Sequence, residues 1–281
     1  MGAILAITNQ KGGVGKTTTA VNLAASLHTT RNAVLLVDID PQGNTTMGCG
    51  VAKGSLENSV CEWLMGDSPH GAVLQAGVDT GFDLLPANGD LVAAEVSLMG
   101  KNQSDTRLRE LLAPLRDTYD FIIIDCPPAL NILTVNALTA ADGLVIPVQC
   151  EYYALEGLSA LVETVEAIRS RSNPKLKIEG IVRTMYDRRN RLTLEVNSQL
   201  FEYFGDAVFA TVVPRNVRLA EAPSFGQSAL GYDRRSRGAM AYLALAGELL
   251  RRRQRTSPAP EAAGLQAQPE AQSDARSEKG E

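Results

Sequence analysis

Long apolar runs are missing from this 281-residue sequence. No stretch approaches the ~18 to 20 apolar residues that a helix needs to cross a bilayer, and this predicts a protein that does not span a membrane. The N-terminus lacks a basic start and a small-residue cleavage pattern and runs into a glycine-rich loop, so we expect a strand there and no signal peptide. Ala6 stands where a myristoylation signal requires serine or threonine, which argues against that lipid anchor.

Cysteine and histidine are also scarce, with four and two copies in the chain. The cysteines show neither CxxC spacing nor a neighbouring histidine cluster, which argues against a zinc site, a redox pair or a disulfide scaffold. We therefore expect reduced thiols in a cytosolic protein. The four positions are Cys49, Cys61, Cys126 and Cys150.

Positive charge is scarce overall, because the net charge is −5. Residues 183–255 nevertheless hold 13 basic and 7 acidic side chains, whereas residues 1–182 hold 12 and 20. A basic segment inside an acidic chain is typical of a surface that binds nucleic-acid phosphates. The alternative is a solvated face with ion pairs to Asp187 and Asp233. The arginines concerned are Arg188, Arg189, Arg191, Arg215, Arg218, Arg234, Arg235 and Arg237.

The hydrophobic share of 44% is ordinary for a globular protein, and apolar runs alternate with helical patterns along the chain. Continuous apolar strands bracketed by helices predict a doubly wound α/β fold with a mostly parallel sheet buried on both faces. The predicted strands are Ala3–Thr8, Ala33–Asp38, Phe82–Leu85, Phe121–Asp125, Leu144–Val148, Ile178–Thr184 and Val208–Val213. The predicted helices are Lys16–Leu27, Ser104–Leu115, Leu130–Ala141, Leu155–Arg169, Leu192–Phe204 and Gly238–Arg253.

The C-terminal segment, residues 256–281, differs in composition from the rest. It is rich in Pro, Ala, Gln, Ser and Glu, and Leu265 is its only large apolar residue. Such a segment cannot bury enough surface to offset the entropy cost of ordering. We expect one domain over residues 1–255 followed by a disordered polar tail.

A glycine-rich loop, TNQKGGVGKTTT, lies between the first predicted strand and the first predicted helix. Glycines let backbone N–H groups face a phosphate, Lys16 supplies a positive charge, and the Thr17 hydroxyl can ligate Mg²⁺. The general GxxxxGK[ST] pattern is not met, because Gln10 stands at its first position, and an additional lysine, Lys11, begins the loop. The alternative is a glycine-rich turn with an incidental lysine. The residues expected around the phosphates are Lys11, Gly12, Gly13, Val14, Gly15, Lys16, Thr17 and Thr18.

Two further strands end in acidic residues. Asp125 closes the apolar run FIIID and is the expected carboxylate for a bound Mg²⁺. Asp38 and Asp40 follow another apolar run, and Asp40 is expected in the same crevice, where it can orient or deprotonate an attacking water. The alternative for Asp38 and Asp40 is a pair of solvated loop carboxylates.

With these residues the sequence resembles the ParA family of DNA-partitioning ATPases, particularly its short chromosomal members of the Soj type. The likeness extends from about Ile4 to Leu250. It includes the motifs KGGVGKTT, LLVDIDPQGN, FIIIDCPP, IPVQCEYYALEGL, PRNVRLAEAPS and DRRSRGA.

The resemblance implies a catalytic cycle with ATP and Mg²⁺. Lys11 would reach across an ATP-sandwich homodimer to the partner's phosphates, and Asp40 would position the hydrolytic water. Lys16, Thr17 and Asp125 would hold phosphate and Mg²⁺. Family positions that contact adenine fall on Pro214 and Asn216, with Met185 a weaker candidate.

The resemblance also implies partners. ATP-bound dimers would bind DNA without reading its sequence, and a ParB-type centromere-binding protein would stimulate hydrolysis and release. The family's DNA-contacting arginines fall on Arg189 and Arg218. A cytoplasmic, nucleoid-associated protein is expected.

Two other functions share this nucleotide chemistry. A MinD-like membrane-positioning ATPase needs a C-terminal amphipathic helix, but here the last predicted helix is followed by a polar, acidic segment. A metabolic enzyme that couples ATP to a ligase or reductase reaction needs a substrate pocket, for which the sequence has no signal. Both remain alternatives to DNA partitioning.

Overall fold

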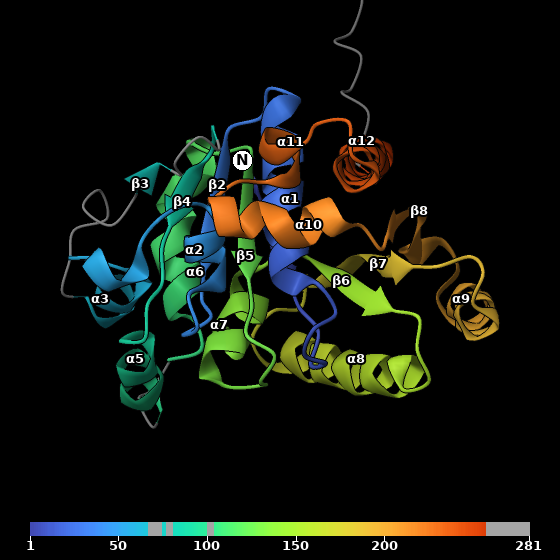
Figure 1. Cartoon of the computed structure of the whole chain (residues 1–281). Coiled ribbons are helices and arrows are strands. Elements are labelled where there is room, and N and C mark those ends of the chain that lie inside the picture. The colour runs from blue at the N-terminus through green and yellow to red at the C-terminus, as the bar shows by residue number, and fades with distance from the viewer. Residues whose placement is uncertain (67–74, 77–80, 100–103, 257–281) are drawn as a thin grey trace, which may run out of the picture.

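A single sheet runs through the middle of the computed structural model, and helices cover both of its faces (Figure 1). The structure describes residues 1–66, 75–76, 81–99 and 104–256. Within these ranges the sheet has eight strands, in the spatial order β3 (Gln75–Ala76), β4 (Asp83–Leu85), β2 (Val34–Asp38), β5 (Phe121–Asp125), β1 (Ala3–Ile7), β6 (Gly143–Gln149), β7 (Lys177–Tyr186) and β8 (Val208–Pro214). Neighbouring strands are parallel except β3 and β4, which are antiparallel at one edge. The predicted fold class is confirmed.

The helices fall into two groups that pack on opposite faces of the sheet (Figure 1). The first group is α1 (Lys16–Thr29), α10 (Val217–Glu221), α11 (Ala229–Tyr232) and α12 (Arg237–Thr256). The second group is α3 (Val60–Met65), α5 (Leu91–Leu98), α6 (Arg107–Leu112), α7 (Ile132–Ala140), α8 (Ala154–Arg171) and α9 (Arg191–Phe204). The short helix α2 (Asn44–Gly48) follows β2, and 3-10 turns are η1 (Lys53–Ser55), η2 (Ala113–Asp117), η3 (Gly205–Ala207) and η4 (Ala222–Phe225).

The strands are apolar throughout because both of their faces are covered. In β1, Ile4 and Ala6 belong to the core beneath the second helix group, and Leu5 and Ile7 belong to the core beneath the first. Successive strand side chains point to opposite faces, so a strand buried on both sides needs an apolar residue at every position. This is why apolar and polar residues do not alternate along the predicted strands.

The three central strands end at the same level of the sheet. In the parallel register Ile7 of β1 pairs with Asp125 of β5, and Asp38 of β2 pairs with the same residue from the other side. The glycine-rich loop and both acidic motifs therefore emerge side by side. Open α/β sheets bind ligands at this carboxyl-terminal edge.

The structure corrects several expected boundaries. The helix predicted over Ser104–Leu115 is shorter, at Arg107–Leu112, and continues as a 3-10 turn. Five short helices, α2, α3, α5, α10 and α11, are additional to the prediction, and each has only four to eight residues. Helices of about two turns or fewer are too short to establish a helical period in a sequence.

Helix α12 is the last described element and extends to Thr256. The tail predicted over residues 256–281 therefore starts one residue too early, and the rest of it, residues 257–281, lies outside the described residues. Among the described helices, none combines the length and hydropathy that a membrane crossing requires.

Candidate active site

The glycine-rich loop leaves β1 and turns directly into α1. Gly13 and Gly15 have positive φ angles of 74° and 89°, in the left-handed region that favours glycine. An added Cβ atom at Gly12 or Gly13 would meet nothing within 4 Å, so the loop is open on that side. Asn9, a residue not singled out in the sequence, anchors the loop because its Nδ2 donates to the Pro147 carbonyl at 2.8 Å.

Lys16 lies at the start of α1 with only 8% of its surface exposed. Its Nζ donates to the carbonyl oxygen of Lys11 at 3.1 Å and so bridges the loop. Burial lowers the pKa of Lys16, and the nearby acidic groups of Asp125, Cys126 and Asp40 oppose that shift. The Lys16 ammonium is therefore influenced by the charges of both acidic motifs.

Asp125 is fully buried at the end of β5. Its Oδ2 accepts hydrogen bonds from Thr17 Oγ1 at 2.8 Å and from Thr45 Oγ1 at 2.6 Å. Its Oδ1 is buried and has no hydrogen-bond partner within the described part of the chain. Burial raises the pKa of Asp125 to about 7, and the charge of Asp38 adds to the shift.

The unpartnered carboxylate oxygen fits a bound Mg²⁺. A buried acceptor without a donor is costly, and Mg²⁺ with its water shell prefers carboxylate and hydroxyl oxygens beside phosphates. Asp125 and Thr17, the two predicted metal-site residues, are in direct contact. Thr45 joins them from α2, although only the threonine pair in PQGNTT hinted at it.

Asp38 and Asp40 are both buried, so the solvated-loop alternative is wrong. Asp38 Oδ2 accepts from the backbone N–H and hydroxyl of Thr46, and its Oδ1 accepts from the Asp40 N–H at 3.1 Å. Burial raises the pKa of Asp38 to about 6 despite these bonds. Asp38 thus supports the segment that follows β2. Asp40 Oδ1 accepts from the Gln42 N–H at 2.9 Å, and the charge of Asp40 acts on Lys16.

A cavity of about 190 Å³ adjoins the loop. Pro214, Asn216 and Met185, the three residues predicted to contact the base, all line it, together with Gly15 and Thr18. Asn216 also begins α10, because its Oδ1 accepts from the Arg218 N–H at 3.0 Å. The phosphate loop and the expected base contacts are therefore continuous in space.

Lys11, the additional lysine of the loop, bonds within its own chain. Its Nζ lies 2.6 Å from Glu151 Oε2 in the segment between β6 and α8. About a third of the Lys11 side chain is exposed. An ion pair this accessible contributes only about 0 to 1 kcal/mol, so it can open readily.

About nine tenths of the chain is similar to proteins of one family. A family profile described as an AAA domain matches residues 2–178. The sporulation initiation inhibitor protein Soj of Bacillus subtilis is 51% identical over 249 residues, covering 89% of this chain and 98% of that protein. The chain belongs to the ParA/Soj family of chromosome-partitioning ATPases.

Solved structures agree with the fold of this ParA/Soj ATPase. A cobyrinic acid a,c-diamide synthase from Mycobacterium smegmatis with bound ADP and magnesium has a TM-score of 0.80 and 38% identity, covering 90% of this chain and 96% of that one. A putative plasmid partition protein from Borrelia burgdorferi B31 bound to AMPPNP has a TM-score of 0.72 and 25% identity, covering 92% and 100%. The first of these proteins is named for a metabolic activity, but it is less similar to this chain, at 38% identity, than Soj is, at 51%.

The arginine-rich segment of the ParA/Soj ATPase lies beside the base cavity. Arg188, Arg189, Arg215 and Arg237 line a second, open cavity of about 970 Å³, with Asp187 among its lining residues. All four arginines are exposed. The structure thus gathers arginines from the segment after β7, the segment after β8 and the start of α12, up to 49 positions apart in the sequence, into one basic surface, which we call the arginine hollow.

The two arginines predicted to contact DNA form the ion pairs with Asp187 and Asp233 that the alternative interpretation named, and Arg218 forms one more with Glu221. Arg189 pairs with Asp187 through two hydrogen bonds of 3.0 and 2.9 Å and lowers the pKa of that carboxyl to about 2. Arg218 pairs with Glu221 at 2.7 Å and with Asp233 at 3.4 Å. Because these pairs are exposed, each contributes little stabilising free energy, and the guanidinium groups can leave their carboxylates readily.

The two buried carboxyl groups, Asp38 and Asp125, should make the free energy of unfolding of the ParA/Soj ATPase depend on pH. Both Asp38 and Asp125 have folded-state pKa values above their ordinary value, so their contribution is fully present below that ordinary value and is lost as pH rises through about 6 to 7. Without Mg²⁺, the free energy of unfolding should fall by about 4 kcal/mol between pH 5 and pH 8 in urea titrations.

Asparagine substitutions test this assignment. Asp125→Asn should flatten the decline, because asparagine does not titrate, whereas Asp117→Asn, at an exposed position, should leave it unchanged. An Asp125→Asn protein with the full wild-type slope would contradict the assignment.

Proposed function

We propose that this protein partitions DNA in an ATP-driven cycle. An ATP-bound homodimer binds DNA without sequence preference, and hydrolysis stimulated by a ParB-type centromere-binding protein releases it. The observation that carries the proposal is the arginine hollow next to the base cavity in an otherwise acidic chain. We also propose a cytoplasmic protein associated with the nucleoid.

The ATPase part of the proposal assigns a role to each site residue. Backbone N–H groups from Lys11 to Thr18 and the Lys16 ammonium bind the phosphates. Thr17 and Asp125 hold Mg²⁺, which supplies charge neutralisation on the phosphate oxygens. Asp40 orients the attacking water, and Asp38 fixes the backbone of Asp40.

The dimerisation part of the proposal concerns Lys11. In the chain described here its ammonium is paired with Glu151. We infer that Lys11 exchanges this carboxylate for the phosphates held by a second copy of the chain. Phosphate is a more highly charged partner than one carboxylate, and closure of a sandwich excludes the water that weakens such pairs.

The DNA-binding part of the proposal concerns Arg189 and Arg218. Exposed guanidinium groups suit phosphate contacts, which provide affinity but little base information. In the dimer the arginine hollows of two subunits would supply enough contacts for binding that depends on ATP and falls steeply with salt. Each arginine would exchange its carboxylate partner for a DNA phosphate.

Charge reversal in the arginine-rich segment tests the DNA assignment. Arg189→Glu and Arg218→Glu should each reduce ATP-dependent retention on unrelated duplex DNA by about tenfold or more, and basal ATP hydrolysis should be unchanged. Arg171→Glu, at the exposed end of α8, is the matched control and should bind as the wild type does. Full retention in both charge-reversal variants would refute these contacts.

The same measurement separates the alternatives. With ATP, ADP and no nucleotide, the partitioning protein binds DNA only with ATP, whereas a membrane-positioning or metabolic ATPase shows no such dependence. The apolar residues Tyr242, Leu245 and Leu249 of α12 are buried against the core, so this face of the helix is not available to lie on lipid. This favours partitioning over a MinD-like role.

A further inference from the structure

Strand β8 contains an irregularity shortly before it reaches the base cavity. In its pairing with β7, Ile181 is opposite Val208 and Arg183 is opposite Val212. Two steps along β7 thus correspond to four along β8, and the residues between bulge out of the ladder. Backbone groups in a bulge lose their partners in the neighbouring strand and must be satisfied in another way.

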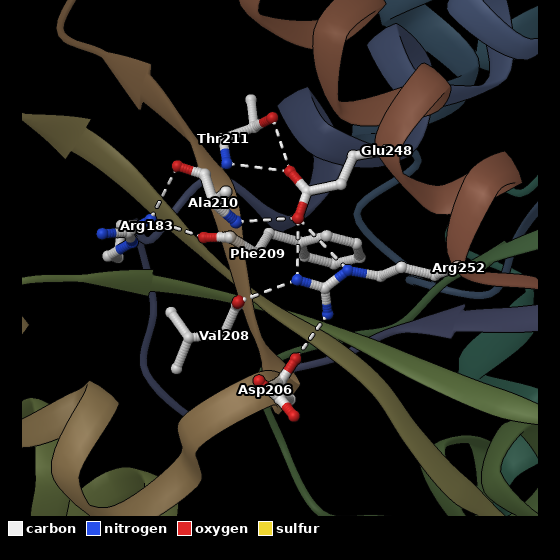
Figure 2. A network of polar contacts seen from close by, with 8 residues as sticks. All are labelled: Arg183, Asp206, Val208, Phe209, Ala210, Thr211, Glu248 and Arg252. Atoms are coloured by element: carbon white, nitrogen blue, oxygen red, sulfur yellow. Dashed lines mark hydrogen bonds and ion pairs between the residues drawn. The ribbon is translucent and has the colours of Figure 1, made fainter. Parts of the chain in front are cut away.

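Two charged side chains satisfy this bulge, as Figure 2 shows. The Glu248 carboxylate of α12 accepts from the Ala210 N–H at 2.8 Å and from the Thr211 N–H at 2.9 Å. The Arg183 guanidinium of β7 donates to the carbonyl oxygens of Phe209 at 2.5 Å and Ala210 at 3.1 Å. We call Arg183 and Glu248 the bulge clamp.

The clamp grips β8 from both faces of the sheet. Arg183 bonds to Asn197 of α9 and lies over the ring of Phe201, on the side of the second helix group. Glu248 comes from α12, in the first group, and accepts a further bond from Arg252 at 2.7 Å. Arg252 also donates to the carbonyl oxygens of Asp206 and Val208 (Figure 2).

The clamp carries charge in a buried place. Glu248 and Arg183 are 9% and 4% exposed. Burial by itself would raise the pKa of Glu248, but hydrogen bonds from Thr211, Ala210 and Arg252 outweigh it and lower the pKa. The carboxylate is therefore ionised at neutral pH, and its two oxygens act only as acceptors.

Both strands at the clamp continue into the base cavity. On β8, the chain passes from Thr211 to Pro214, which lines the cavity with Asn216. On β7, Met185 is two residues beyond Arg183, lines the same cavity and has a positive φ of 48°, uncommon for a residue with a side chain. The intervening Thr184 donates to the Val14 carbonyl of the phosphate loop at 2.8 Å.

We propose that Arg183 and Glu248 are positioning residues for nucleotide binding: by holding the β8 bulge, they place Pro214 and Asn216 against the base. The inference rests on the nucleotide site under the proposed function and deepens it. A one-residue change in the bulge would shift the register of the strand and move the base contacts relative to the phosphate loop. The β8 side of the clamp, Glu248, therefore affects binding of the base much more than binding of the phosphates.

Comparing two ligands tests the proposal. Glu248→Gln replaces one of the two acceptor oxygens with an NH₂ group that faces backbone donors. Its affinity for Mg·ATP should fall about tenfold, whereas its affinity for Mg·tripolyphosphate, which has no base, should stay within about twofold of the wild type. Thr211→Val, which removes only the hydroxyl bond to Glu248 at 2.7 Å, should give a smaller loss of the same kind and serves if Glu248→Gln does not fold.

The chain offers a matched control for a merely structural effect. Glu179 of β7 is also 9% exposed and also bonds to an arginine of α12, Arg253, at 3.1 Å. Glu179→Gln should lower the melting temperature to a similar degree and leave the affinities for both ligands unchanged. Equal losses of ATP and tripolyphosphate affinity in Glu248→Gln, or the same ATP defect in Glu179→Gln, would overturn the proposal.

Asn216→Ala separates this proposal from the base site itself. If Asn216→Ala weakens ATP binding and Glu248→Gln does not, the base site stands and the bulge clamp has no positioning role. If neither variant affects ATP binding, both the base site and the clamp are wrong. A selective loss of ATP affinity in both variants supports the clamp.

Discussion

Replacing Lys16 with alanine should weaken ATP binding by at least about 30-fold, measured by titration calorimetry with a slowly hydrolysed analogue. Lys16 is buried at the mouth of the phosphate loop, where a charge interacts with phosphate more strongly than in water. Removing one partner of such a pair costs about 2 to 5 kcal/mol, much of it from leaving the phosphate without its counter-charge. Because burial already penalises the charged lysine, the fold should survive the change.

Two further variants sharpen this result. Lys16→Met retains the length of the side chain without its charge and should bind as poorly as Lys16→Ala. Lys11→Ala removes the other lysine of the loop, which is paired with Glu151, and should retain ATP affinity in the monomer. Unchanged affinity in both Lys16 variants would show that the loop does not bind phosphate.

Replacing Asp40 with alanine should reduce ATP hydrolysis by about two orders of magnitude, the usual contribution of a positioned general base. ATP should still bind, because the phosphate contacts come from the loop and not from Asp40. Trapped ATP should then cause the dimer to accumulate on size exclusion chromatography. Asp40 is held near Lys16 by the hydrogen bond from its N–H to Asp38, so a small side chain there leaves the loop intact.

A double variant tests the dimer at the same time. In Asp40→Ala with Lys11→Ala, ATP should bind but dimer should not accumulate, because the residue proposed to contact the partner's phosphates is missing. Normal turnover in Asp40→Ala would reject its role in catalysis. Dimer accumulation in the double variant would reject the role of Lys11.

Much of this site could be predicted because its signals are local. The glycines at positions 13 and 15 are needed for positive φ angles, and Lys16 and Thr17 follow immediately on α1. Asp125 and Asp38 each end an uninterrupted apolar strand, and the ends of parallel strands meet at one edge. Each of these statements needs only a few consecutive residues and a general rule of α/β folds.

Other parts of the site could not be predicted, because their partners are distant in the sequence. Thr45 donates to Asp125, 80 positions away, and Lys11 bonds to Glu151, 140 positions away. A helix as short as α2 gives no periodic pattern in the sequence, so the sequence does not predict that Thr45 lies beside Asp125. Glu248 is 37 and 38 positions away from Thr211 and Ala210, the residues whose N–H groups it accepts from.

The sequence by itself determined the alternation of the long strands and helices along the chain, the phosphate loop and the acidic strand ends, because backbone conformation and burial on both faces impose residue types locally. Only the tertiary structure decided which polar groups meet. It brought Thr17 into contact with Asp125, gathered arginines from three separate segments into one hollow, and set Arg183 and Glu248 on opposite sides of the β8 bulge. Hydrogen bonds and charges act over a few ångströms in space, and sequence separation does not reveal that distance.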